Sequence, residues 1–181
     1  MKPVLRLFAV LALWAFCASV PAAHAAGDAS VAFVDMQMLL TGSNAGKDLQ
    51  QQIETKKTEF LAVISKEEQK LHEEQKGLSE QKEALTPEEF SKKAKAFEAK
   101  LAATRRMTQE KKKILETGAN KALEELRSKI LKAVQSVSDE KGYELVVSRQ
   151  SIVIGAKGLD ITEDVLAILN RDVVKIDLEL K

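Results

Sequence analysis

The sequence predicts an α+β protein in which a small β-rich body, built from both ends of the chain, carries a long antiparallel coiled-coil helical hairpin. Three observations predict this fold. Between residues 47 and 138 the only proline is Pro87, and helix-forming Glu, Gln, Lys, Ala and Leu dominate. The hexapeptide LTPEEF (85–90) interrupts that stretch with signals for a helix start. Short alternating apolar segments, typical of strands, lie on either side of it.

The first 25 residues are predicted to be a cleaved signal peptide. Lys2 and Arg6 precede an apolar run over residues 4–18, and Ala23 and Ala25 provide the small residues of a cleavage site. Export would leave a mature chain without cysteine, which therefore gains no disulfides from an oxidising compartment. The remaining charge is close to neutral, so net charge indicates no particular partner.

Composition argues against an enzyme. The mature chain would keep one histidine, His72, within the charged segment KLHEEQK, where it has no visible catalytic partner. The segment GSNAGKD (42–48) resembles a phosphate-binding loop, but it has three residues between its glycines and an Asp where Ser or Thr should bind Mg²⁺. We interpret it as a turn in which Ser43 or Asn44 caps the next helix. We therefore expect no catalytic residue, no metal site and no cofactor.

The first predicted strand is SVAFVDM (30–36), in which apolar residues alternate. It belongs to a discontinuous body, predicted over residues 26–46 and 139–181. The helical arm is predicted over residues 47–138, with its tip at 85–90.

The N-terminal half of the arm has a sparse coiled-coil pattern. Ile64, Leu71, Leu78 and Leu85 recur every seven residues, but the companion positions 67, 74 and 81 are Glu, Glu and Gln. A stable dimeric coiled coil has two apolar residues in each heptad, so this seam is predicted to pack weakly.

The tip segment LTPEEF contains four independent signals for a new helix. Thr86 is a good N-cap, Pro87 suits the first helical position, and Glu89 completes a capping box with Thr86. Leu85 and Phe90 occupy the positions of a hydrophobic staple. The segment is therefore predicted to end one helix and start its antiparallel partner, rather than to kink a single helix.

This hairpin fixes which residues face one another. If Leu85 meets Phe90, then Leu78 faces Phe97, Leu71 faces Thr104 and Leu49 faces Leu126. The pairs near both ends are apolar, whereas those in the middle are not. The arm should therefore be able to bend.

Charge divides between the two predicted arm helices. Residues 59–89 hold four Lys and nine Glu, whereas residues 91–113 hold nine Lys or Arg and two Glu. One interpretation is that opposite charges pair across the seam. The other is that a basic strip faces an anionic lipid or an acidic partner, and no nucleic-acid platform is visible. The predicted basic strip comprises Lys92, Lys93, Lys95, Arg105, Arg106, Lys111, Lys112 and Lys113.

The C-terminal segments complete the predicted body. YELVVS (143–148) and SIVIG (151–155) have the composition of strands, and DITEDVLAILN (160–170) that of a short amphipathic helix capped by Asp160 or Thr162. The tail after Asn170 alternates again. A body this small needs support, so we expect strands from several chains to share one core; a marginal monomeric sheet is the alternative. The candidates for body core or subunit interface are Val31, Phe33, Leu145, Val147, Ile152 and Ile154.

The order of these elements resembles the Skp/OmpH family of periplasmic chaperones for outer-membrane proteins. The similarity is most specific in VAFVDMQMLL (31–40) and YELVVSRQSIVIGAKGLDITEDVL (143–166). It implies a homotrimer with a β-rich trimerisation body, whose three arms enclose a cavity. It also implies binding of unfolded outer-membrane β-barrel proteins without ATP in the periplasm. The chain departs from the family pattern in its near-neutral charge and its C-terminal tail.

Both the residues and the resemblance favour a holdase, a chaperone that binds unfolded chains and prevents their aggregation. Such a protein needs shallow, scattered apolar contacts rather than a tight pocket. A structural coiled-coil spacer or adaptor in the cell envelope is the alternative function. The predicted client-contact residues, each of which could instead pack the seam, are Leu71, Leu78, Phe90, Phe97 and Met107.

Overall fold

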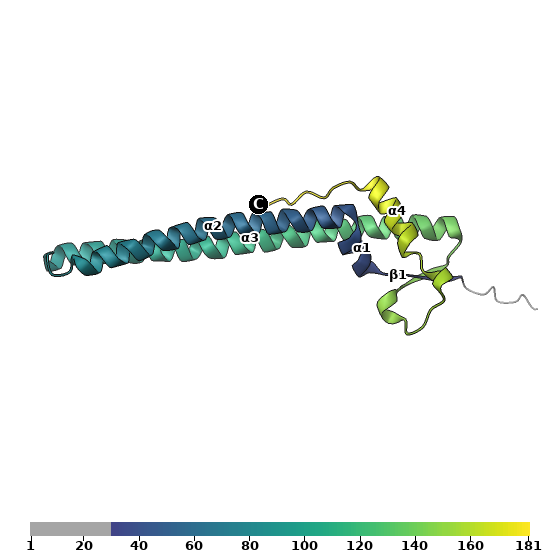
Figure 1. The fold of residues 1–181 in the computed structure, drawn as a ribbon, viewed down its shortest axis with the longest axis horizontal. Coiled ribbons are helices and arrows are strands. Elements are labelled where there is room, and N and C mark those ends of the chain that lie inside the picture. Colours follow the sequence, from purple (N-terminus) through teal and green to yellow (C-terminus); the bar gives the residue numbers. More distant parts are fainter. Residues whose placement is uncertain (1–29) are drawn as a thin grey trace, which may run out of the picture.

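A computed structural model describes residues 30–181, so the predicted signal peptide (1–25) lies outside the described residues. Two long helices lie side by side and project from a small body (Figure 1). The first and the last regular elements of the described residues both lie in this body. Two 3₁₀ turns, Arg149–Ser151 and Lys157–Leu159, lie between the last strand and the last helix. The main elements are β1 (Val31–Val34), α1 (Met36–Gly42), α2 (Asn44–Glu80), α3 (Pro87–Lys141), β2 (Leu145–Ser148) and α4 (Thr162–Asp172).

The segment after β1 forms a short helix that the sequence analysis did not predict. Asp35 caps α1, since its side chain accepts a hydrogen bond from the N–H of Met38 at 2.9 Å, and Leu39 is fully buried. Ser43 ends α1 and caps α2, because its hydroxyl accepts the N–H of Gly46. The prediction of a helix cap in 42–48 is therefore confirmed at Ser43.

The tip of the long helical pair is built as the hexapeptide LTPEEF indicates. The Thr86 hydroxyl accepts the N–H of Glu89 at 3.3 Å, and the Glu89 carboxylate accepts the N–H of Thr86 at 3.0 Å. This confirms the predicted capping box, with Pro87 in the first turn. The chain turns here, and α3 lies beside α2 along the whole length of α2 (Figure 1).

The contacts between α2 and α3 show the relative direction of the two helices. Lys93 donates to Gln81 at 2.6 Å, Lys100 pairs with Glu74 at 2.7 Å, and the Lys111 ammonium lies 4.5 Å from the centre of the Phe60 ring. As the α3 residue number rises, the α2 residue number falls. The two helices therefore run in opposite directions at these contacts.

We call residues 50–117 of α2 and α3, with their connection, the arm, because they have a distinct pattern of burial. No side chain in this range is fully buried. Half-buried positions recur every three or four residues, as expected for a coiled-coil seam. Several of these seam positions are polar, namely Glu67, Glu74, Thr104, Thr108 and Lys111.

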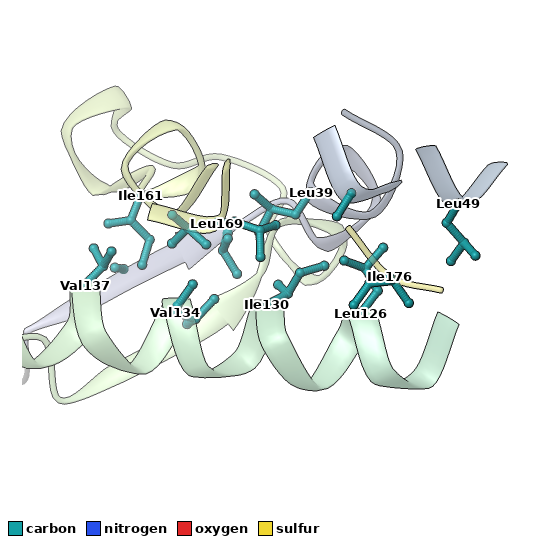
Figure 2. Packing of buried hydrophobic residues seen from close by; sticks show 14 of the residues in the cluster. Leu39, Leu49, Leu126, Ile130, Val134, Val137, Ile161, Leu169 and Ile176 are labelled. Carbon is teal, nitrogen blue, oxygen red and sulfur yellow. The ribbon is translucent and has the colours of Figure 1, made fainter. Parts of the chain in front are cut away.

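The remaining described residues form the body, which has a continuous hydrophobic core (Figure 2). The C-terminal part of α3 supplies one wall of this core, and β1, α1, the first turns of α2, and α4 cover it. The core side chains at its centre have almost no solvent exposure; they include Leu39, Leu126, Ile130, Val137, Ile161, Val165 and Leu169.

The body contains a two-stranded parallel sheet. β1 pairs with β2 from Val31 opposite Leu145 to Val34 opposite Ser148, which confirms these two predicted strands. On its other side, β1 is bridged at Phe33 by Asp160. The side chain of Asp160 also accepts the N–H of Thr162 at 3.0 Å and so supports the start of α4.

The third predicted strand, SIVIG (151–155), is not present. This segment follows a 3₁₀ turn and forms a loop, in which Val153 is 97% exposed and Ile154 is 90% exposed. Both sides of β1 are already occupied within the chain, and the loop leaves the free edge of β2 unpaired. The apolar, β-branched side chains of Val153 and Ile154, which suggested a strand, therefore lie on the surface.

Candidate functional site

The described residues offer surfaces rather than an enclosed reaction site. Within residues 30–181, no cluster of three or more His, Cys, Asp or Glu side chains is arranged to hold a metal ion. The buried polar side chains of this region are Ser43, Ser138 and Thr162, and each makes a hydrogen bond that serves the fold. None of the helices described is both long and apolar enough to cross a membrane.

The predicted client-contact residues all lie along the arm. Leu71, Leu78, Phe90, Phe97 and Met107 are each half-buried. They pack partly between the helices and partly face solvent. Each therefore contributes to the seam and also presents apolar surface that a client could contact.

A shallow groove near the arm tip brings two of these residues together. Leu78 and Phe97 line it with Ala96, beside the charged Glu74 and Lys93, and its volume is about 300 Å³. Gly77 also lines the groove, and the space beside its Cα is open, since a Cβ at this position would meet no other atom within 4 Å. The groove offers an apolar floor with charged edges, which suits shallow contact with a flexible chain.

Two further apolar residues of the arm were missed by the sequence analysis. Leu61 is 56% exposed and Val63 is 43% exposed on α2. The segment LAVI (61–64) carried the signal, because apolar residues at consecutive helical positions cannot all face one seam. Ile64 takes the seam position, so Leu61 and Val63 face solvent.

The predicted basic strip divides over different sides of α3. Lys92, Arg106 and Lys113 are exposed and separated by multiples of seven residues, so they share one heptad position. Lys93 and Lys111 instead reach α2, at Gln81 and Phe60. The remaining members of the strip, Lys95, Arg105 and Lys112, are exposed.

Charge pairing across the arm is sparse. Among the described residues, Glu74–Lys100 is the one ion pair that joins the two arm helices. The other ion pairs of the arm lie within α2, such as Glu67–Lys70 at 2.6 Å. Most of the acidic surface on α2 and the basic surface on α3 is therefore directed to solvent. The ion pairs that do form are exposed, and an exposed ion pair contributes little to stability.

The predicted body residues occupy two environments. Phe33 is buried, and Val31, Val147 and Ile152 are half-buried. Leu145 and Ile154 are exposed, together with Val153 and Leu159. These exposed apolar side chains lie on β2 and on the loop after it, where β2 has no second neighbouring strand within residues 30–181.

Arg149 lies at the centre of this part of the body. Its guanidinium pairs with Asp160 at 2.8 Å and lies 5.7 Å from the centre of the Phe33 ring. Phe33, Arg149 and Ile152 line a cavity of about 210 Å³ with the exposed loop. An open strand edge, exposed apolar residues and a hollow beside them are typical of a surface that meets another chain.

The fold is that of a small body carrying one long two-helix arm with shallow apolar and charged surfaces. The sequence model of the family described as outer membrane protein (OmpH-like) matches residues 30–169. The chain belongs to this OmpH-like family, which confirms the resemblance found in the sequence. No curated protein sequence matches the chain.

A solved structure shares this fold. It is that of a candidate outer membrane chaperone (OmpH-like) from Caulobacter crescentus CB15, with a TM-score of 0.80 and 21% sequence identity. The similarity covers 84% of this chain and 90% of the other. The match to the family ends at residue 169, so the C-terminal tail lies beyond it.

Proposed function

We propose that this chain is an ATP-independent periplasmic holdase that binds unfolded outer-membrane β-barrel proteins and prevents their aggregation. The observation that carries the proposal is the arm, which has apolar residues along its length and no fully buried side chain between residues 50 and 117. Membership of the OmpH-like family supports the same conclusion.

The arm surface has the properties that a holdase needs. A holdase must bind many sequences and release each one to its folded state, so contact should be shallow and distributed. The groove around Leu78 and Phe97 and the exposed pair Leu61 and Val63 provide such contact at separate points. Few strong contacts join the arm helices, so the arm can adapt to clients of different size.

The body supports assembly into a homotrimer, as the family resemblance implies. A parallel sheet of two strands is small and is normally found buried on both faces. Here β2 has one strand neighbour, and Leu145, Val153 and Ile154 are exposed beside it. Contact with other copies would cover these residues and place three arms around one cavity.

The basic outer side of α3 supports a second contact. Lys92, Arg106 and Lys113 face solvent on one side of the helix and form no ion pair within the described chain. We include anionic lipid or lipopolysaccharide among the partners of this surface, and no nucleic acid.

The alternative function is a structural coiled-coil spacer or adaptor in the envelope. A spacer is expected to have a seam packed along its length, because it must resist bending. The polar seam residues Glu67, Thr104 and Lys111 give the arm the opposite property. The holdase is therefore the better-supported function.

Light scattering of residues 26–181, alone and after dilution of a urea-unfolded β-barrel protein into the sample, tests the proposal. We expect a trimer that becomes a soluble complex with about one client, as a cavity that encloses its client implies. If the β-barrel protein aggregates as fast as it does alone, the holdase is wrong and the spacer becomes the leading function.

A pair of variants locates the contact surface in the same experiment. Leu61→Ser with Val63→Ser removes exposed apolar side chains from the arm, whereas Leu131→Ser removes one that is 55% exposed at the body end of α3. We expect the arm variant to protect the client less well and the body variant to protect it as the parent does. The mass of each variant alone shows whether its assembly is unchanged.

A further inference from the structure

The C-terminal tail occupies a groove at the root of the arm. After α4 ends at Asp172, residues 173–181 run back along α2 and α3 without forming a helix or a strand (Figure 1). Ile176 is 2% exposed and lies beside Leu126 at the edge of the core (Figure 2). One side chain of the tail is thus inserted among residues of the body core.

Gln52 of α2 binds the main chain of the tail. Its amide nitrogen donates to the carbonyl oxygen of Ile176 at 2.8 Å, and its amide oxygen accepts the N–H of Leu178 at 3.0 Å. The second amide hydrogen is donated to Asp48 at 2.7 Å, which fixes the orientation of the amide. Because both tail contacts are to backbone atoms, they do not depend on which side chains the bound segment carries.

Gly118 of α3 allows the tail to approach the helix closely. A Cβ at this position would lie 2.6 Å from the carbonyl oxygen of Glu179 and 2.8 Å from a methyl carbon of Leu180. These distances are shorter than van der Waals contact, so the groove fits an extended main chain only because residue 118 has no side chain. Ala122, one turn further along α3, keeps the floor of the groove shallow beside Ile176.

Few contacts hold the tail in place. Besides Ile176, Leu178 and the Gln52 amide, the tail is held by one ion pair to α3, Lys121–Glu179 at 3.1 Å, and both partners are exposed. Val174 is 77% exposed, and Leu178 and Leu180 are half-buried. Each ordered residue loses backbone entropy, so a segment held at so few points is suited to exchange.

We propose that this groove is a binding site for extended chain segments with alternating apolar residues, and that the tail is its resident, exchangeable occupant. A strand segment of an unfolded β-barrel protein has the required chemistry: a carbonyl and an N–H two residues apart for Gln52, and an apolar side chain for the position of Ile176. Its identification as a client segment rests on the proposed holdase function. The tail then competes with the client for a site at the root of the arm.

A labelled peptide tests this site directly. The probe is fluorescein-labelled VVKIDLELK, the sequence of residues 173–181, and fluorescence anisotropy measures its binding to the full chain and to a chain that ends at Asp172. We expect saturable binding to the shortened chain. Binding to the full chain should be about tenfold weaker, because the tethered tail competes at a high effective concentration.

Two Gly→Ala variants of the shortened chain provide a matched comparison. Gly118→Ala places a methyl group where the bound main chain passes, whereas Gly158→Ala places one in open space in the loop before α4. Gly118→Ala should abolish peptide binding, and Gly158→Ala should leave it unchanged. A peptide with proline in place of Leu178 lacks the N–H that Gln52 accepts and should not bind.

Several results would overturn the proposal. Absence of binding to the shortened chain, equal binding by the two Gly→Ala variants, or failure of a urea-unfolded β-barrel protein to displace the peptide would each do so. If circular dichroism shows that the shortened chain is not folded, the full-length Ile176→Asp variant replaces it, since a buried carboxylate disfavours docking of the tail. Aggregation of the β-barrel protein is measured in the same samples, so protection without peptide binding refutes this site alone.

Discussion

The two parts of α3 have opposite patterns of burial, although they belong to one continuous helix. In the body, Leu126 and Ile130 are completely buried in a core formed by every neighbouring element. In the arm, no side chain of residues 50–117 is fully buried. The helix itself is equally regular in both parts, so the difference arises from what packs against it and from the side chains at its seam.

This difference separates the two properties that a binding scaffold needs. A core of buried apolar side chains unfolds only with the whole domain, whereas a half-exposed seam can open locally at low cost. The body can therefore keep a fixed structure while the arm bends around what it binds. In the proposed holdase, the body would maintain assembly and the arm would adapt to the client.

Matched Leu→Ala substitutions provide the largest test of this comparison. Leu126→Ala removes a fully buried side chain of the body, and we expect a loss of about 2–5 kcal/mol in the free energy of unfolding. Leu71→Ala removes a half-buried seam residue, so the loss should be about 1 kcal/mol or less. Urea unfolding followed by circular dichroism at one fixed protein concentration measures both values.

Equal losses for the two variants would contradict the distinction between body and arm. The m-value of each transition serves as the control, because it should be unchanged if both variants unfold in the same way as the parent. Hydrogen exchange should also show that Leu71→Ala increases local opening in the arm and not in the body.

The cap at the arm tip gives a smaller, local effect. Thr86→Ala removes the hydroxyl that accepts the N–H of Glu89, and an N-cap of this kind stabilises a helix by about 1 kcal/mol. Thr86→Ser keeps the hydroxyl and is the control. Amide hydrogen exchange at residues 88–92 should be faster in the first variant and close to the parent in the second. Equal exchange in all three proteins would show that the cap does not stabilise the tip.

Some features of the fold could be predicted from the sequence because they depend on local signals. The cap at Thr86 and Glu89 was predictable because its hydrogen bonds join residues three positions apart. β1, β2 and α4 were predictable because periodicity and composition agree within each segment. Such local signals are decisive where neighbours in sequence are also neighbours in space.

Other features depended on contacts between distant residues. The apolar loop 151–155 has strand composition, but it pairs neither with β1, whose two sides are taken by β2 and Asp160, nor with the free edge of β2. Docking of the tail depends on Gln52, more than 120 residues away in sequence, as the separation of 124 from Ile176 shows. The exposed pair Leu61 and Val63 could have been found, because four consecutive apolar residues cannot share a seam.

A substitution in the seam should make the arm resemble the body. Thr104 is half-buried and lies opposite Leu71 in the register set by the Glu74–Lys100 pair. Thr104→Leu adds apolar contact there and should stabilise the arm by about 0.5–1 kcal/mol, part of what full burial of a leucine provides. Thr104→Ser is the control, and hydrogen exchange in the middle of the arm measures the effect.

If Thr104→Leu does not slow exchange, the polar seam is not what makes the arm flexible. If exchange slows, the same variant also provides a test of the proposed function. A stiffer arm should adapt less well to large unfolded clients, and the amount of client kept soluble at equal concentration should fall.

The smallest expected effect is a dependence of the arm tip on pH. Hydrogen bonds from the side chain and the backbone of Thr86 lower the pKa of Glu89 below its ordinary value of 4.5, and the nearby Lys93 acts in the same direction. Because the folded state holds Glu89 ionised, its contribution to stability is complete above pH 4.5 and is lost as the pH falls through the lowered pKa. Amide exchange at the tip should therefore become faster over that acidic range, while the body core, which contains no buried carboxylate in residues 30–181, should change less. Glu89→Gln keeps an acceptor for the N–H of Thr86 but cannot ionise, so it should remove this local pH dependence. An equal acid response at the tip of Glu89→Gln would show that other groups, and not the capping carboxylate, control how the arm tip opens.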